Sequence, residues 1–324
     1  MARRRRRKLT DAEMEVPHAI EEEIVDDFDI ALHLFLRHCK AKNLSEHTIT
    51  YYRNELTSFR KLLEEQAVTT NPNRITGKIV KENVIMRMMD EGRKESAINA
   101  RLRAIRAFFN FLYSEHYISD NPADDFALIR QKKTVIETFT REQVRALLRQ
   151  PDQTTFTGLR DYTMLLLLFE TGVRVKELLG IRVGDIRWED NMIRIRDPKG
   201  YRERLVPFQA TVKKQLRKYV KVRGEVDSDL LFITVDNKAM TVRAFQDRMK
   251  MYGRRAGIKG VRCSPHTARH TFAKMAVQNG ANIFELQKIL GHSSLEMVRN
   301  YVNLFSSDVA TAHKRFSPIE KLSL

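Results

Sequence analysis

The sequence predicts a mainly α-helical protein with one small antiparallel β-sheet, organised as two domains. Through most of the chain, apolar residues recur at intervals of three and four, which is typical of amphipathic helices. Alternating apolar and polar residues occur only in three short stretches, 186–188, 192–196 and 203–207, which predict a three-stranded meander. A length of 324 residues is also about that of two ordinary domains.

The first domain, which we place at residues 29–125, is expected to be entirely helical. Glycine is nearly absent from it, and Ser45 is a suitable N-cap for a helix that contains Ile49, Tyr52 and Leu56. A third strong amphipathic pattern runs through 96–117. Proline at position 122 should stop it, because the residue before a proline is disfavoured in helical geometry.

A polar and basic segment, 126–139, is expected to be a linker to the second domain, 140–305. Thr140 and Gln143 have the spacing of a capping box, which indicates that a new helix begins there. Ser264 followed by Pro265 likewise predicts that a helix begins there, because proline is favoured at the first position of a helix. Helices are expected at 158–169, 174–179, 210–222, 241–256, 265–280 and 282–290.

The chain carries a formal net charge of +17, and this charge is distributed unevenly. Residues 1–30 contain six basic and nine acidic residues, a net of −3, so the remainder carries about +20. We expect residues 1–28 to form a disordered charged arm. A basic folded body favours a polyanionic partner, most often nucleic acid. An anionic membrane surface is the rival, but no segment approaches the ~18 apolar residues of a membrane span.

The two cysteines, Cys39 and Cys263, match neither a disulfide framework nor a C-x-x-C motif. The arginines near the N-terminus are followed by acidic residues rather than by the apolar segment of a secretory signal. We therefore expect a cytoplasmic protein.

Polar residues of the second domain gather at predicted helix ends and turns. They are Arg174, Lys199, His266, Arg269, His270, His292 and Tyr301. Taken singly, each is more often a surface or structural residue than a functional one. His266 and His270 have the i, i+4 spacing of a zinc pair, but no third ligand accompanies them. Residues 286–304 also resemble a helix-turn-helix, which would suit a non-catalytic DNA-binding regulator.

Transfer of a phosphoryl group between oxygens would give nearly all of these residues a role. Guanidinium groups are the best bidentate partners for the charge that develops on the phosphate, so Arg174 and Arg269 are candidate clamps. Tyr301 is the candidate nucleophile and His266 its base. Lys199 would protonate the leaving sugar oxygen as general acid. Such a site needs no metal ion and no other cofactor, because arginines replace the metal.

Four ordered motifs resemble the tyrosine recombinase (phage integrase) family, in particular its Xer-like and mobile-element integrases. They are Thr171–Ile181, Lys199–Pro207, His266–Phe272 and Leu290–Leu295 through Tyr301. The resemblance implies a helical core-binding domain followed by a catalytic domain. It implies the same roles for Arg174, Lys199, His266, Arg269 and Tyr301, and it adds His292 as a hydrogen-bond donor to the phosphate. Glu177 matches a supporting acidic position of the family, and His270 a buried structural histidine.

What the resemblance implies about function is site-specific DNA recombination through a 3′-phosphotyrosyl intermediate, without metal or ATP, as in DNA integration or transposition. In the family, a homotetramer, or a tetramer shared with a related recombinase, acts on two DNA sites, with accessory directionality proteins as further partners. Residues 306–324 would be either a tail exchanged between protomers or a helix packed on its own domain. We expect the bacterial cytoplasm, at the nucleoid, as the location. A type IB topoisomerase and a helix-turn-helix regulator remain the alternatives.

Overall fold

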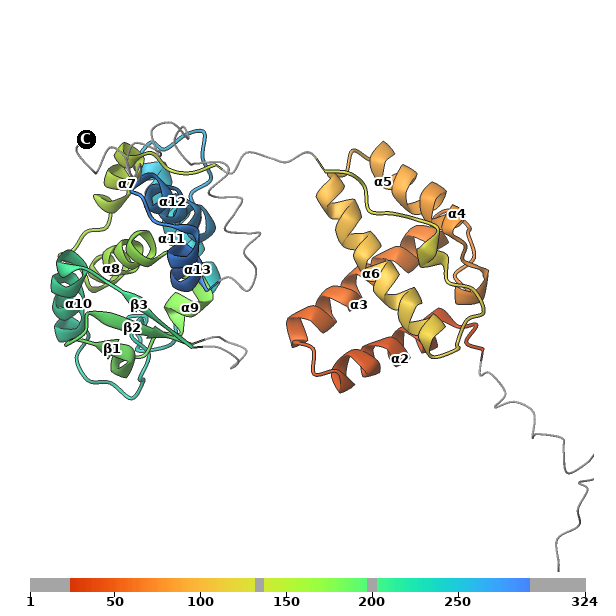
Figure 1. The fold of residues 1–324 in the computed structure, drawn as a ribbon, viewed down its shortest axis with the longest axis horizontal. Coiled ribbons are helices and arrows are strands. Elements are labelled where there is room, and N and C mark those ends of the chain that lie inside the picture. The colour runs from red at the N-terminus through yellow and green to blue at the C-terminus, as the bar shows by residue number, and fades with distance from the viewer. Residues whose placement is uncertain (1–23, 132–136, 197–202, 292–324) are drawn as a thin grey trace, which may run out of the picture. The chain divides into compact units, whose positions relative to one another are not determined.

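The computed structural model describes residues 24–131, 137–196 and 203–291. The chain divides into two compact units, which lie within residues 1–134 and 135–324 and are described separately (Figure 1). The expected disordered arm falls mostly outside the described residues, and so does the tail at 306–324.

The first unit is a helical bundle, as predicted (Figure 1). The side chain of Asp27 caps its first helix, and Ser45 caps the second, because its hydroxyl accepts a hydrogen bond from the amide of Thr48. The helices are α2 (Phe28–Ala41), α3 (Glu46–Glu64), α4 (Gly77–Ile79), a π-helical segment (Val80–Met86), α5 (Arg87–Asp90) and α6 (Glu95–Ser114).

Aromatic side chains fill the centre of this unit. Phe108 of α6 packs against Phe28 and Phe35 of α2, with ring centroids 5.3 and 5.7 Å apart. Edge-on and tilted ring pairs of this kind add to the free energy gained by burying apolar area. The three main helices α2, α3 and α6 are therefore held by one core.

Packing of the first unit extends beyond the range 29–125. Val25 is buried, and its amide donates to the carbonyl oxygen of Tyr117. Phe126 is buried in the same core, and Ile129 exchanges two hydrogen bonds with the buried side chain of Asn99. Both ends of the unit are thus fixed to its helices.

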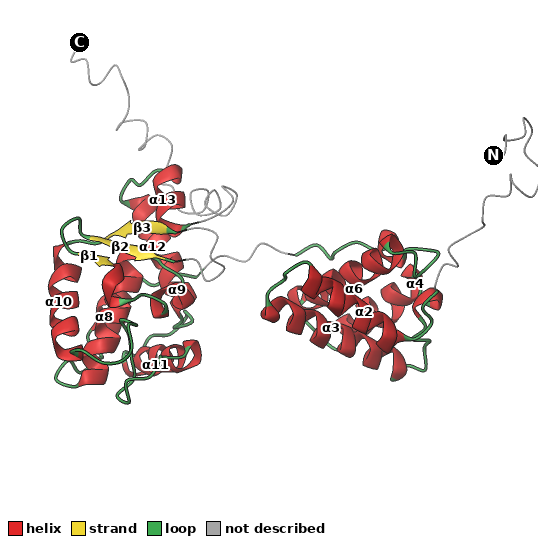
Figure 2. Ribbon diagram, turned by 90° about the horizontal axis from the view of Figure 1, so that it is seen from below, coloured by secondary structure: helices red, strands yellow, loops and turns green. Residues whose placement is uncertain are grey.

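The second unit combines helices with the small sheet (Figure 2). Thr140 and Gln143 form the predicted capping box, and Ser264 with Pro265 begins the helix predicted there. The helices are α7 (Arg141–Leu148), α8 (Phe156–Thr171), α9 (Val175–Leu179), α10 (Ala210–Arg223), α11 (Val242–Arg255), α12 (Pro265–Gln278) and α13 (Ile283–Leu290). The mainly buried α8 lies between α10 and α12.

The predicted meander is confirmed: β1 (Ile186–Arg187), β2 (Met192–Ile195) and β3 (Arg204–Pro207) pair antiparallel in that order. Ile193 and Val206 are paired and turn inward to the core, whereas Leu205 is exposed on the other face. The turn between β2 and β3 carries Lys199, which lies outside the described residues.

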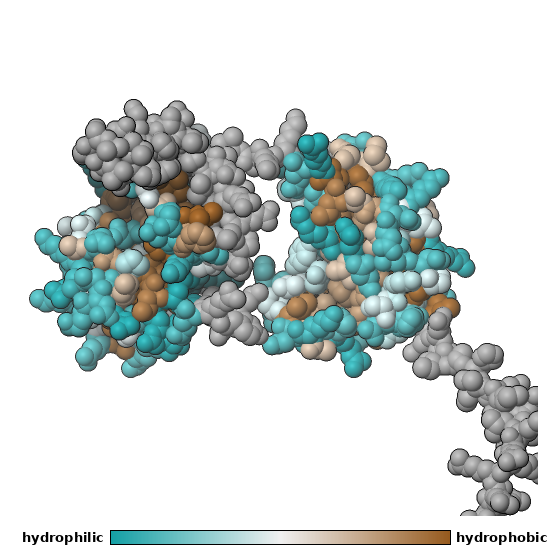
Figure 3. All heavy atoms as spheres, viewed as in Figure 1, coloured by the Kyte–Doolittle hydropathy of each residue, from teal (hydrophilic) through white to brown (hydrophobic). Residues whose placement is uncertain are grey.

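On the face shown in Figure 3, the described surface of both units is mostly hydrophilic, with scattered apolar patches. Within the ranges that the structure describes, no helix is both long enough and apolar enough to cross a membrane.

A buried charge network joins α8 to α11. The carboxylate of Asp161 accepts hydrogen bonds from Arg160, from Arg248 and from the hydroxyl of Tyr252, which lies 2.8 Å away. Burial and the charge of Asp161 raise the pKa of Tyr252 to about 12. Tyr252 therefore stays protonated and acts as a donor throughout the physiological range.

Replacing Asp161 by alanine should strongly destabilise the second unit, because the buried guanidinium of Arg160 would lose its carboxylate partner. Removing one partner of a buried ion pair costs about 3–5 kcal/mol. Denaturant unfolding would measure this loss. As a control, Asp190→Ala removes an exposed ion pair with Arg187 and should cost less than about 1 kcal/mol. Equal losses for the two variants would contradict the structural role of the network.

Candidate active site

The chain changes direction sharply between α8 and α9. Gly172 ends α8 with φ of +61°, a left-handed conformation that favours glycine. A Cβ atom at Gly172 would also lie only 2.3 Å from the ring of Phe272 and 2.8 Å from the side chain of Leu290. Two residues later, Arg174 is the N-cap of α9. This turn therefore brings Arg174 close to the packing of α12 and α13.

Glu177 holds Arg174 in place through a buried carboxylate that accepts four hydrogen bonds. Two come from Arg174, from its amide and from Nη1, both at 2.9 Å. The other two come from Arg204 of β3, from Nη1 at 3.0 Å and from Nη2 at 2.8 Å. Burial alone would raise the pKa of Glu177, but the hydrogen bonds and charges of Arg204 and Arg174 outweigh it, so the pKa is lowered. The carboxylate remains charged at neutral pH.

Arg269 of α12 connects the ends of two helices. Its Nη1 donates to the carbonyl oxygen of Gly172 at 2.7 Å, and its Nη2 to that of Leu290 at 2.9 Å. These carbonyls lie at the C-terminal ends of α8 and α13, where the helix dipole favours a positive charge. Only 4% of Arg269 is exposed, so its guanidinium is fixed in the packing.

His266 lies one turn before Arg269 on α12, and its side chain is exposed. Partial desolvation and the positive charges of Arg269, Arg174 and Arg262 lower the pKa of His266. The ring of His270 lies edge-on to that of His266, with centroids 4.1 Å apart. Desolvation and the charges of His266 and Arg269 lower the pKa of His270 to about 4. Both imidazoles are therefore neutral near pH 7.

The structure thus brings together three of the predicted site residues, Arg174, His266 and Arg269. The other three, Lys199, His292 and Tyr301, lie outside the described residues. The second helix of the alternative helix-turn-helix, at 286–304, also lies outside the described residues. Among the described residues, His266 and His270 have no further His, Cys, Asp or Glu close enough to complete a metal site with them.

Sequence reasoning gave no role to Arg204, although it lies in one of the four quoted motifs. Its side chain is only 16% exposed and reaches both α9 and α13. Arg204 is the first residue of β3, but Arg202 and Glu203 directly before it are charged as well, so its sequence position alone did not single it out. The partners of that charge could not be identified without the fold.

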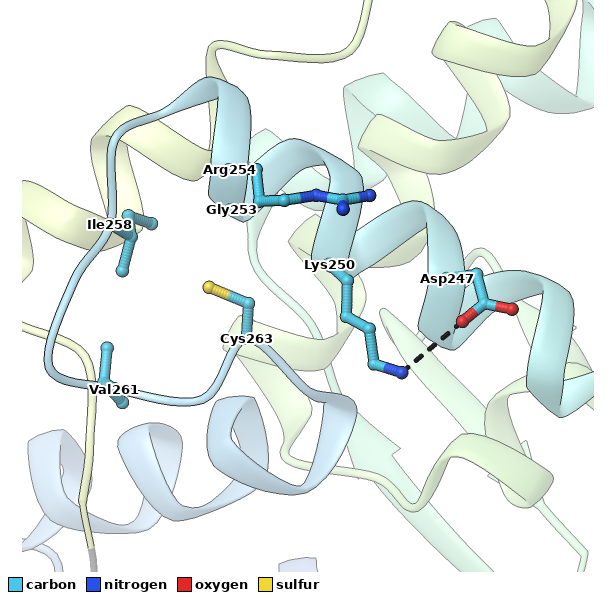
Figure 4. Close-up of a pocket in the computed structure, with 7 residues that line it drawn as sticks. All are labelled: Asp247, Lys250, Gly253, Arg254, Ile258, Val261 and Cys263. Carbon is cyan, nitrogen blue, oxygen red and sulfur yellow. Dashed lines mark hydrogen bonds and ion pairs between the residues drawn. The ribbon is translucent and has the colours of Figure 1, made fainter.

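A separate pocket of about 480 Å³ lies between α11 and the loop that leads to α12. The sulfur of Cys263 points toward Gly253 and Ile258, and Lys250 pairs with Asp247 at the edge (Figure 4). Burial raises the pKa of the Cys263 thiol, so the thiol is protonated at neutral pH. Arg174, His266 and Arg269, the predicted site residues that the structure describes, do not line this pocket.

Comparison with known proteins agrees with this arrangement. The model of the phage integrase family matches residues 137–307, and that of the phage integrase N-terminal SAM-like domain matches residues 32–116. The chain belongs to the phage integrase family, and it is a tyrosine recombinase by class.

Among curated relatives, tyrosine recombinase XerC of Chlamydia caviae is 30% identical over 89% of this chain and 98% of its own length. Tyrosine recombinase XerD of Staphylococcus epidermidis is 30% identical over 86% of this chain and 94% of its own. The similar solved structures include the Tn1549 transposon integrase in complex with a circular intermediate DNA. Its TM-score is 0.72 at 21% identity, and the match covers 89% of this chain and 98% of the integrase chain. The recombinase XerH bound to palindromic difH has a TM-score of 0.72 at 20% identity, and the match covers 89% of this chain and 85% of the XerH chain.

Proposed function

We propose that this protein is a site-specific DNA recombinase that cuts and rejoins strands through a 3′-phosphotyrosyl intermediate. The observation that carries the proposal is the convergence of Arg174, His266 and Arg269 from α9 and α12, around the junction of three helix ends. Two guanidiniums beside a neutral imidazole suit a phosphodiester whose negative charge increases during reaction.

In the proposed cleavage step, the hydroxyl oxygen of Tyr301 attacks phosphorus and forms a new O–P bond. The bond from phosphorus to the 5′ oxygen breaks, and that oxygen receives a proton from Lys199. The proton of Tyr301 passes to His266. The lowered pKa of His266 supports this role, because a neutral imidazole can accept a proton near pH 7.

Arg174 and Arg269 would bind the non-bridging oxygens of the phosphate, with His292 as a further donor. The side chain of Arg174 is 47% exposed while Glu177 anchors it, so it can reach a ligand without losing its orientation. Arg269 is fixed by two carbonyls and buried, where its field is screened less than at the surface. No step requires a metal ion, because cationic side chains neutralise the charge. Rejoining is the reverse reaction with a different 5′-hydroxyl.

The partners proposed are two double-stranded DNA recombination sites, held by a homotetramer or by a tetramer with a related recombinase. Curated relatives named XerC and XerD, and solved structures of an integrase and of XerH with DNA, support a DNA partner. We assign residues 29–125 to core binding, 140–305 to catalysis and 306–324 to exchange between protomers. The site of action would be the bacterial nucleoid in the cytoplasm.

A nicked suicide substrate tests the function. When the nick lies next to the cleaved phosphate, the short 5′-hydroxyl fragment diffuses away and the covalent protein–DNA adduct accumulates. We expect an adduct that resists denaturant, formed in the presence of EDTA and without ATP. A helix-turn-helix regulator would bind this DNA but leave no adduct. A topoisomerase would form the adduct and also relax supercoiled plasmid DNA without a specific site, which a recombinase should not do.

A further inference from the structure

Arg204 lies where three elements of the second unit meet. It begins β3, which contacts α13 (Figures 1 and 2). Its Nη1 and Nη2 hold the two oxygens of Glu177 on α9, and its Nε donates to the carbonyl oxygen of Ile289 at 2.8 Å. One planar guanidinium therefore bonds a buried carboxylate and the last turn of α13 at the same time.

The end of α13 fits closely around this guanidinium. Gly291 caps α13 with φ of +64°, and a Cβ atom there would lie 2.9 Å from Cζ and Nη1 of Arg204. The neighbouring carbonyl of Leu290 is bonded by Arg269. Successive carbonyls at the end of α13, those of Ile289 and Leu290, are thus held by Arg204 and by a proposed phosphate clamp, and only Gly291 separates them from His292 in the sequence.

Arg204 also shares its carboxylate with the other proposed clamp. Oε1 of Glu177 accepts from Nη1 of Arg174 and from Nη1 of Arg204, so the two guanidiniums are fixed to one atom. A lysine could not reproduce this arrangement. Its ammonium is a point charge, whereas the fork of arginine makes two parallel bonds to a carboxylate and a third at Nε.

We propose that Arg204 is a positioning residue for strand cleavage, which sets the orientation of Arg174 through Glu177 relative to the end of α13. The inference rests on the proposed function. Arg204 acts through its neighbours and is given no contact with the DNA phosphate.

Single-turnover formation of the adduct on the nicked substrate tests this role. Arg204→Met should slow adduct formation by roughly 10- to 100-fold, since a misplacement of about 1 Å can cost that much, while DNA affinity changes less than about threefold. Arg204→Lys should be nearly as slow, because an ammonium keeps the positive charge but cannot make the paired hydrogen bonds that orient Glu177. A lysine variant at the wild-type rate would show that only charge matters and would overturn the inference.

Arg160→Met is the matched control. Arg160 also bonds a buried carboxylate, that of Asp161, and a backbone carbonyl, that of Ile233. The described hydrogen bonds and ion pairs of Arg174 and Glu177 involve none of these three residues. We expect it to lower thermal stability without slowing adduct formation at a temperature where both variants are folded. A rate loss in Arg160→Met equal to that of Arg204→Met would show a general effect of instability and contradict the inference.

A pH profile separates positioning from a merely structural effect. Arg204 lowers the pKa of Glu177, so its removal should raise that pKa, and Glu177 should become protonated at higher pH. The acid limb of the rate profile is therefore expected to shift to higher pH in Arg204→Met and to stay unchanged in Arg160→Met. In a chain that already carries Glu177→Gln, Arg204→Met should no longer shift the acid limb. The double variant should be no slower than the slower of the two single variants, so the rate losses should not add. An unshifted limb, or additive losses, would contradict the inference.

Failure of this inference differs from failure of the proposed function. If the wild-type chain forms no adduct, the proposed function is wrong. If the wild type forms the adduct and Arg204→Met forms it equally fast, the function stands and the positioning role is wrong.

Discussion

Replacing Tyr301 by phenylalanine is expected to abolish the covalent protein–DNA adduct while leaving DNA affinity within about twofold of the wild type. Only the hydroxyl oxygen is lost, and that oxygen is the proposed nucleophile. Binding depends instead on many contacts between basic side chains and phosphates, so one hydroxyl contributes little to it. Denaturing gel electrophoresis of the suicide-substrate reaction measures the adduct, and gel-shift titration measures the affinity.

Tyr113→Phe is the matched control, because Tyr113 is an exposed tyrosine of the first unit. It should form the adduct at the wild-type rate. Adduct formation that persists in Tyr301→Phe would assign the nucleophile to another residue. Loss of DNA binding in the same variant would mean that the missing adduct says nothing about nucleophilic attack.

Arg269→Lys should reduce the rate of cleavage by roughly 10²- to 10³-fold, the usual effect of removing one preorganised donor to a developing charge. A lysine keeps the charge but cannot donate to the carbonyls of Gly172 and Leu290 together, so the junction of α8 and α13 loses a bond. Single-turnover rates at saturating protein would separate this loss from weaker binding.

Arg255→Lys, at the exposed end of α11, is the control and should cleave at the wild-type rate. If Arg269→Lys cleaved as fast as Arg255→Lys, a fixed guanidinium at this position would not be required. Melting temperatures of both variants must lie well above the assay temperature, because Arg269 is buried.

The local signals of the sequence were sufficient for most helix starts and for the small sheet. Ser45, Thr140 and Ser264 each cap the helix that their position predicts, since capping depends on residues only two or three apart. The three strands follow from short alternating patterns and the turns between them. The convergence of Arg174 with Arg269 was predicted from the proposed chemistry and from the resemblance to a family.

Interactions between distant segments could not be predicted in this way. The role of Arg204 depends on a meeting of β3, α9 and α13, and its partners Glu177 and Ile289 lie 27 and 85 positions away. The partners of Asp161 on α11 are equally remote, with Tyr252 at 91 positions. A spacing pattern carries no information about such contacts, because they arise only when the helices pack.

The most direct test of the central claim is to identify the residue that is joined to DNA. The adduct formed on the nicked substrate would be digested with protease and nuclease, and the peptide that retains a nucleotide would be sequenced by mass spectrometry. We expect the nucleotide on the hydroxyl oxygen of Tyr301, linked through a 3′-phosphate. A nucleotide on any other residue, or a 5′-phosphate linkage, would contradict the proposed chemistry.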